Sequence, residues 1–278
     1  MPALREVTRF DRLELKHQLD ARQRQAIEAV VRDRLVPDPY GDADGRYPIV
    51  SLYFDDAALT AFWERERGMA SRRKLRVRIY GGAGTRAAPA CFVEVKHKYG
   101  RRTAKRRIAL PVGEAMALVR DGTTPATPLT AREALVADEV RGMVRAGRLE
   151  PRLVVRYTRH AFLGDADAPD LRVTFDSDVR ARARDLVLRP DDDDFDVALL
   201  PAGASVLEIK VDHVVPLWLA EAVGRLGPLG AATSKYSLAA EQLLVPSFLS
   251  RQRAAAVAAP AHARNGRSRH GRVQPALR

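Results

Sequence analysis

Cysteine is nearly absent from this chain of 278 residues, because Cys91 is its only cysteine. A single cysteine excludes an internal disulfide and a cysteine-rich zinc site. Cys91 stands beside Phe92 in a strand-like run, where a cysteine commonly packs as a small hydrophobic residue. The chain is therefore expected to be neither a disulfide scaffold nor a thiol-dependent enzyme.

Long apolar runs, a signal sequence and several familiar motifs are also missing. No apolar stretch approaches the roughly 20 residues that cross a bilayer, and the first residues lack the apolar core of a signal peptide. There is no GxxxxGK phosphate loop and no motif for a Ser-His-Asp hydrolase. We expect a folded cytoplasmic protein, since 46% hydrophobic residues can bury a substantial core.

Aromatic residues are scarce at 6%, whereas basic residues are in excess, with a formal net charge of +12. This excess indicates an anionic partner. Proteins that bind single-stranded nucleic acid interleave aromatic and basic side chains to stack bases, and this chain does not. Nucleic acid is therefore not the expected partner.

Short stretches with charged residues at alternate positions are the main positive feature. They are residues 12–16, 74–80, 94–96, 154–157, 172–176 and 208–212. Successive side chains of a strand point to opposite faces, so each stretch gathers its charges on one face of a sheet. That face lies either in water, as in an ordinary antiparallel sheet, or inside a closed barrel as the wall of a tunnel. Arg, Lys and Glu dominate these positions, which favours the tunnel.

Eight strands and four helices can be predicted along the chain. The strands are expected near residues 9–17, 48–55, 74–81, 90–99, 103–110, 151–160, 170–177 and 205–212. Asp20, Thr130 and Pro216 are typical residues at helix starts, and another helix is expected to open at Asp55 and Asp56. The predicted fold class is α+β, a closed eight-stranded antiparallel β-barrel with helices packed outside.

Residues 250–278 differ in composition from residues 1–249. They are rich in Ala and Arg and contain no acidic residue. No apolar periodicity runs through them, so we expect a basic disordered tail behind one domain over residues 1–249. The tail either contacts an anion such as nucleic acid or lipid, or is solvated without a specific role.

Eight motifs in a fixed order relate the chain to a known family. They are residues 14–16 (ELK), 51–55 (SLYFD), 74–80 (KLRVRIY), 94–98 (EVKHK), 155–157 (VRY), 172–176 (RVTFD), 208–210 (EIK) and 234–236 (SKY). In this order and spacing, from about Arg5 to Leu244, the chain resembles the polyphosphate polymerase domain of the vacuolar transporter chaperone (VTC) family. The resemblance implies the CYTH-like triphosphate tunnel fold, whose basic interior binds ATP, a divalent cation and polyphosphate. The Ala- and Arg-rich composition fits a bacterial, stand-alone member.

The resemblance also implies roles for single residues. Those that would bind phosphate are Lys16, Arg76, Arg78, Lys96, Lys105, Arg156, Arg172, Lys210 and Lys235. Among them, the implied catalytic residues are Lys16, Arg76, Arg78, Lys96 and Lys235. Glu208, with Glu14 as a second ligand, would bind Mn²⁺ or Mg²⁺, hard cations that prefer carboxylate oxygen. Phosphoryl transfer requires positioning and charge neutralisation, which such a set can supply.

Several of these residues have a second interpretation. Glu14 is either a metal ligand or a counter-charge for a tunnel cation, and Lys210 is either a phosphate ligand or a partner of Glu208. Asp176 either binds the metal or orients Arg172, and the orienting role is the favoured one. Two histidines, His97 and His160, lack partners at metal-ligand spacing and are expected to be structural. The two tryptophans, Trp63 and Trp218, are expected in the core.

Three functions remain open. The first is metal-dependent transfer of phosphoryl groups from ATP to a growing polyphosphate chain, which the Ser-Lys-Tyr segment and the Lys-rich hairpin favour. The second is a triphosphatase that hydrolyses tripolyphosphate or nucleotides, and the third is a non-catalytic module that binds polyphosphate or nucleotides. The expected partners are a nucleoside triphosphate and polyphosphate. A separate membrane protein would hold the chain at the inner face of a membrane if its role is peripheral.

Overall fold

An antiparallel sheet forms the centre of the protein in the computed structural model, which describes residues 13–81, 91–100, 102–231 and 234–258. Its long strands are β1 (Leu13–Leu19), β3 (Arg46–Asp55), β4 (Ser71–Tyr80), β5 (Cys91–Tyr99), β6 (Arg102–Leu110), β7 (Glu150–Leu163), β8 (Arg172–Arg182) and β10 (Ser205–Val211). The short strands are β2 (Val36–Pro37), β9 (Val197–Ala198) and β11 (Gly230–Ala231). All eight predicted strands are present, with ends shifted by a few residues.

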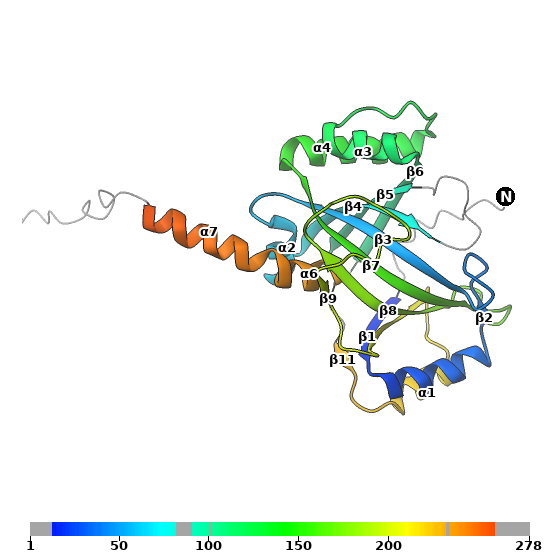
Figure 1. Ribbon diagram of the computed structural model, residues 1–278. Helices are drawn as coiled ribbons and strands as arrows, with labels where there is room; N and C mark the ends of the chain where they lie inside the picture. The colour runs from blue at the N-terminus through cyan, green and yellow to red at the C-terminus, as the bar shows by residue number, and fades with distance from the viewer. Residues whose placement is uncertain (1–12, 82–90, 101, 232–233, 259–278) are drawn as a thin grey trace, which may run out of the picture.

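The strands follow the order β11-β1-β10-β8-β7-β3-β4-β5-β6, with β2 on β7 and β9 on β8. The sheet curls into a half-barrel (Figure 1), so the predicted α+β fold with an antiparallel tunnel-type sheet is confirmed. Among the described residues, no backbone ladder joins β6 to β1 or β11. Side chains approach each other across the interior instead: Lys96 Nζ of β5 lies 3.6 Å from Glu14 Oε2 of β1.

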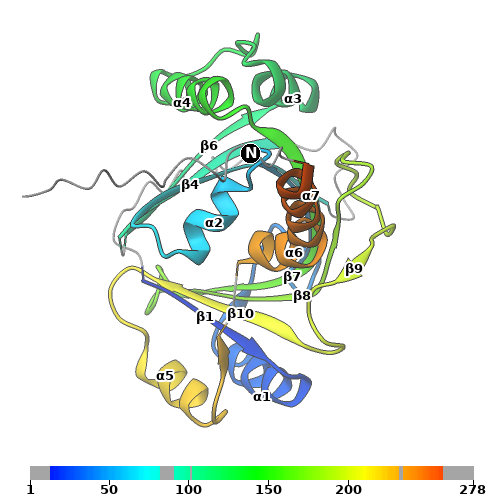
Figure 2. The same ribbon diagram turned by 90° about the vertical axis from the view of Figure 1, so that its left-hand side faces the viewer.

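Helices cover both sides of the curled sheet. They are α1 (Ala21–Arg32), α2 (Thr60–Glu66), α3 (Val112–Asp121), α4 (Ala131–Gly147), α5 (Leu217–Gly224), α6 (Lys235–Leu243) and α7 (Val245–Ala258). The outer face of β3 to β6 packs under α3 and α4, and that of β1, β8 and β10 packs on α1 and α5. Figure 2 shows α2 and α6 on the concave side, where they cover apolar parts of β3 and β7. Trp63 and Trp218 lie at the margins of these clusters and are only partly buried.

Local capping explains two of the four predicted helix starts. Asp20 Oδ1 accepts a hydrogen bond from the Gln23 N–H at 2.8 Å, and Thr130 caps α4 in the same way. The predicted start of α2 at Asp55 and Asp56 is wrong, because Leu59 adopts a left-handed conformation (φ 57°) and the helix begins at Thr60. Asp56 still accepts the Thr60 N–H at 3.0 Å.

The C-terminal end of the described chain is helical. Residues 250–258 of the predicted tail continue α7, which extends from the sheet in Figure 1, and residues 259–278 lie outside the described part. None of the described helices has both the length and the apolar composition needed to span a bilayer.

Candidate active site

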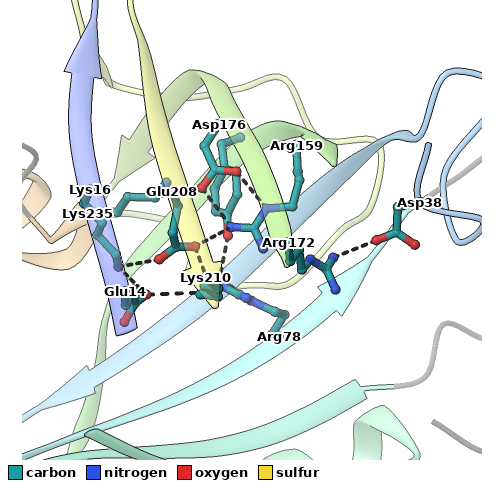
Figure 3. Close-up of polar contacts among 12 residues, drawn as sticks. Glu14, Lys16, Asp38, Arg78, Arg159, Arg172, Asp176, Glu208, Lys210 and Lys235 are labelled. Atoms are coloured by element: carbon teal, nitrogen blue, oxygen red, sulfur yellow. Dashed lines mark hydrogen bonds and ion pairs between the residues drawn. The ribbon is translucent and has the colours of Figure 1, made fainter. Parts of the chain in front are cut away.

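Alternate side chains of β1, β8 and β10 form one side of the concave face, here named the paired wall. Its members are Glu14, Lys16, Arg172, Asp176, Glu208 and Lys210. Lys16 lies opposite Glu208 in the register, with Nζ 2.6 Å from Glu208 Oε1 and 2.9 Å from Glu14 Oε1. Lys210 Nζ lies 2.9 Å from Glu208 Oε2 (Figure 3). Each cation of this pair of strands therefore has a carboxylate partner.

The charges of the paired wall stabilise one another. Burial by itself would lower the pKa of Lys16, but the carboxylates of Glu208 and Glu14 raise it above its ordinary value. Burial would raise the pKa of Glu208, but Lys210 and Lys16 hold it well below the usual range of a carboxyl group. Lys16 and Glu208 are consequently both ionised at neutral pH. Glu14 acts here as a counter-charge, which was one of its two predicted roles.

Glu14 and Glu208 also suit a divalent cation. Both supply hard carboxylate oxygens from neighbouring strands, as Mg²⁺ and Mn²⁺ prefer. Across the described ranges, no group of three or more Asp, Glu, His and Cys side chains converges on one point. Mg²⁺ commonly binds through one or two carboxylates and completes its shell with water and substrate phosphates. The two glutamates therefore fit a cation that shares its shell with a substrate.

The opposite side of the concave face, named the cationic wall, is built by β4, β5 and β6. Its members are Lys74, Arg76, Arg78, Lys96 and Lys105, with Glu94 as the carboxylate among them. In the sheet register Lys74 lies opposite Lys96, which in turn lies opposite Lys105. Like charges at directly opposed positions destabilise a sheet, so this row is not explained by folding alone.

Arg76 and Arg78 differ in how they are held on the cationic wall. Arg76 Nη2 lies 2.6 Å from Glu94 Oε2, and Lys105 contacts the same carboxylate. Burial would raise the pKa of Glu94, but Arg76 and Lys105 hold it well below the usual range. Arg78 donates to Ser51 Oγ at 3.0 Å and to Tyr157 OH at 3.1 Å, and it is only 4% exposed. Neutral oxygens thus fix the Arg78 guanidinium, which forms no direct ion pair with a carboxylate among the described residues.

Lys235 reaches the interior from the first turn of α6. Its Nζ lies 2.6 Å from Asp176 Oδ2, and Arg159 of β7 forms a bidentate pair with the same carboxylate at 2.7 and 2.9 Å. Burial would raise the pKa of Asp176, but Arg159 and then Lys235 lower it well below its ordinary value. Asp176 therefore joins β7, β8 and α6 through charge-assisted hydrogen bonds.

The prediction that Asp176 orients Arg172 is wrong. Arg172 Nη2 donates to Asp38 Oδ2 at 2.6 Å and to Tyr47 OH at 2.8 Å. Figure 3 shows the Arg172 side chain pointing toward Asp38 and away from Asp176. Asp38 is itself buried and accepts the Tyr40 N–H at 3.1 Å, so it holds Arg172 from a fixed turn. A contact between residues 134 positions apart carried no signal in the sequence.

Arg156 is the one predicted phosphate ligand that the structure does not bring to the concave face. It lies opposite Val50, which packs under α3 and α4, and its Nη1 is 3.2 Å from both Asp178 and Asp193. The inward arginine of β7 is Arg159, which lies opposite Tyr47 and was not predicted. Arg159 shares the parity of Tyr157, which was the signal for it.

The other predicted ligands, Lys16, Arg76, Arg78, Lys96, Lys105, Arg172, Lys210 and Lys235, share the concave face with Glu14 and Glu208. The two histidines have structural contacts. His97 Nε2 lies 3.1 Å from Ser71 Oγ, and His160 lies between Glu28 Oε1 at 3.1 Å and the Asp44 carbonyl at 2.8 Å. The concave face therefore combines many converging cations with two candidate metal ligands.

No curated protein matches the chain. The solved PH1819 protein of Pyrococcus horikoshii OT3 is 14% identical, with 83% of this chain and 99% of that chain covered and a TM-score of 0.42. A Bacillus halodurans protein provisionally described as an adenylate cyclase is 10% identical, with 87% and 92% covered and a TM-score of 0.41. The family model of the VTC domain matches residues 11–244, and the chain therefore belongs to the VTC domain family.

Proposed function

We propose that this protein transfers the γ-phosphoryl group of ATP to the end of an inorganic polyphosphate chain on the concave face of its sheet. The main observation that supports this proposal is that the cationic wall lies opposite Glu14 and Glu208 of the paired wall. Membership of the VTC domain family supports a function related to nucleotides or polyphosphate. The proposal adds the direction of transfer, the acceptor and the metal.

In the proposed reaction, the bond between the γ-phosphorus and its bridging oxygen breaks while a terminal polyphosphate oxygen bonds to that phosphorus. ADP leaves, and the polyphosphate grows by one unit. Such a transfer depends on positioning and on neutralising the oxygens of the moving group. Arg78 meets both needs, because Ser51 and Tyr157 already fix its guanidinium. Lys235, at the start of α6, would contact the γ-phosphate.

Glu208 and Glu14 would hold Mn²⁺ or Mg²⁺. When bound, the ion would neutralise charge on the phosphate oxygens. Lys16 and Lys210, now paired with these glutamates, would be free to bind phosphate as the carboxylates turn to the ion. The two glutamates and the two lysines would then each exchange one opposite charge for another, so none of these four charges would be left alone.

A product assay with purified protein, ATP and Mn²⁺ or Mg²⁺ tests the proposal. Products are separated by gel, and free phosphate is counted in the same reaction. A metal-dependent ladder of polyphosphate is the expected result. Free phosphate without a ladder would indicate a triphosphatase, and binding of tripolyphosphate without turnover would indicate a non-catalytic module. Either outcome would overturn the polymerase proposal.

A further inference from the structure

The hydrogen-bond partners of Lys74 on the cationic wall are neutral hydroxyl groups. Its Nζ donates to Ser237 Oγ at 3.2 Å and to Ser234 Oγ at 3.4 Å, and it lies 4.7 Å from the centre of the Tyr236 ring. Within the part of the chain that the structure describes, no carboxylate forms an ion pair with Lys74. Lys16, Lys96, Lys105, Lys210 and Lys235 all have such a pair.

The charged groups around Lys74 are mostly cations. Arg72 of β4, Lys96 of β5 and Arg65 of α2 all face it. The facing carboxylate is Asp55 at the end of β3, which already accepts hydrogen bonds from Tyr236 OH and from the Ala61 N–H. Burial, followed by the charge of Arg65, lowers the pKa of Lys74 to about 7. The Lys74 ammonium group therefore loses its proton at a lower pH than an ordinary lysine does.

An anion on the concave face would change this balance. Lys74 is two residues before Arg76 on the same face of β4, and its serine partners flank Lys235 on α6. A phosphate held by Arg76 and Lys235 would thus come within reach of the Lys74 amine. Its negative charge would favour the ammonium form, and the ammonium would bind the phosphate in return.

We propose that Lys74 is a further phosphate-binding residue of this site and that it takes up a proton when the anion binds. The inference rests on the proposed function, because it adds one contact to the same concave face. The competing role is structural, with Lys74 serving only to hold α6 through two serine hydroxyls. A structural lysine would show no proton uptake linked to ligand binding.

The test measures binding of tripolyphosphate to the full chain by calorimetry, without metal, in two pH 8 buffers that differ in protonation enthalpy. The difference in apparent enthalpy gives the number of protons taken up, and subtracting a variant from the wild type cancels the protons of the ligand itself. Lys74→Met and Lys74→Arg are compared with Arg73→Met. Arg73 is the adjacent cation on the outer face of β4, where it is half exposed and lies 3.7 Å from Glu139.

We expect Lys74→Met to take up about one proton fewer than the wild type and to bind about tenfold more weakly at pH 7. Lys74→Arg should bind within about threefold of the wild type yet lose the same proton, because a guanidinium stays charged. Arg73→Met should match the wild type in both measurements. Equal proton uptake by the wild type and Lys74→Arg would overturn the inference. Absence of tripolyphosphate binding by the wild type would instead overturn the proposed function.

Discussion

The two walls of the concave face handle charge in opposite ways. On the paired wall, Glu14 and Glu208 neutralise Lys16 and Lys210 at 2.6–3.7 Å, so these strands need no ligand to be electrostatically balanced. On the cationic wall, Glu94 forms ion pairs with Arg76 and Lys105. Arg78 and Lys74 instead donate hydrogen bonds to neutral oxygens. The paired wall is therefore electrostatically balanced by its own carboxylates, whereas in the proposed function the cationic wall would bind the anion.

The largest effect is expected from the paired wall, in Glu208→Gln. This change keeps the size of the side chain but removes the charge that a divalent cation requires, so turnover should fall about a hundredfold or more. Metal-free binding of tripolyphosphate should persist or tighten, because a repulsive charge is gone. Turnover and metal-free affinity are measured for this variant and for Glu221→Gln, a matched change on the exposed surface of α5. Full metal-dependent turnover in Glu208→Gln would remove Glu208 from the metal site.

On the cationic wall, Arg78→Ala should weaken binding itself. The lost charge-assisted contacts correspond to about 1.5–3 kcal/mol of binding free energy for tripolyphosphate. Calorimetry without metal measures this loss, and thermal unfolding shows whether the variant is folded. Arg73→Ala, on the opposite face of the same strand, is the control. If both variants bind equally well, the cationic wall is not the binding surface.

Lowering the pH should reduce the stability of the folded protein through Asp176 of the paired wall. Its pKa is lower in the folded chain than the unfolded value of about 4, so its contribution to stability is complete above that value and is lost as the pH falls below it. A contribution of about 2 kcal/mol is expected from a shift of this kind. Urea unfolding between pH 6 and pH 3 measures the slope for the wild type and for Asp176→Asn. A slope that is equally steep in both proteins would contradict this assignment.

The smallest effect is expected where a neutral group positions a cation. Tyr47→Phe removes the hydroxyl that accepts from Arg172 and donates to Asp38 at 3.3 Å. Tripolyphosphate should bind about 1 kcal/mol more weakly. The effect should disappear in the Arg172→Ala background, and Tyr40→Phe, at an exposed tyrosine, should have none. An equal loss in both backgrounds would show that Tyr47 does not act through Arg172.

Strand alternation predicted much of this arrangement. On β4, Leu75, Val77 and Ile79 pack outward, so Arg76 and Arg78 must point inward. The same rule placed Lys16 and Glu208 on one face. The inward face of these strands could be predicted because their two faces differ sharply in polarity.

The sequence was less informative where both faces of a strand are apolar or where partners are remote. Val154 and Val155 are both buried on β7, so these two residues do not show which face of the strand points inward, and Arg156 was predicted in place of Arg159. Asp38 lies in a turn before β3 and meets Arg172 only through the fold. Such a contact depends on tertiary packing and has no local pattern.

A crystal structure with tripolyphosphate and without metal would test the difference between the walls most directly. We expect the anion on the concave face, with its oxygens bonded to Arg76, Arg78 and Lys74 of the cationic wall while Glu208 keeps its pairs with Lys16 and Lys210. Tripolyphosphate bound on the outer face of the sheet, or held by Lys16 and Lys210 with the cationic wall empty, would contradict it.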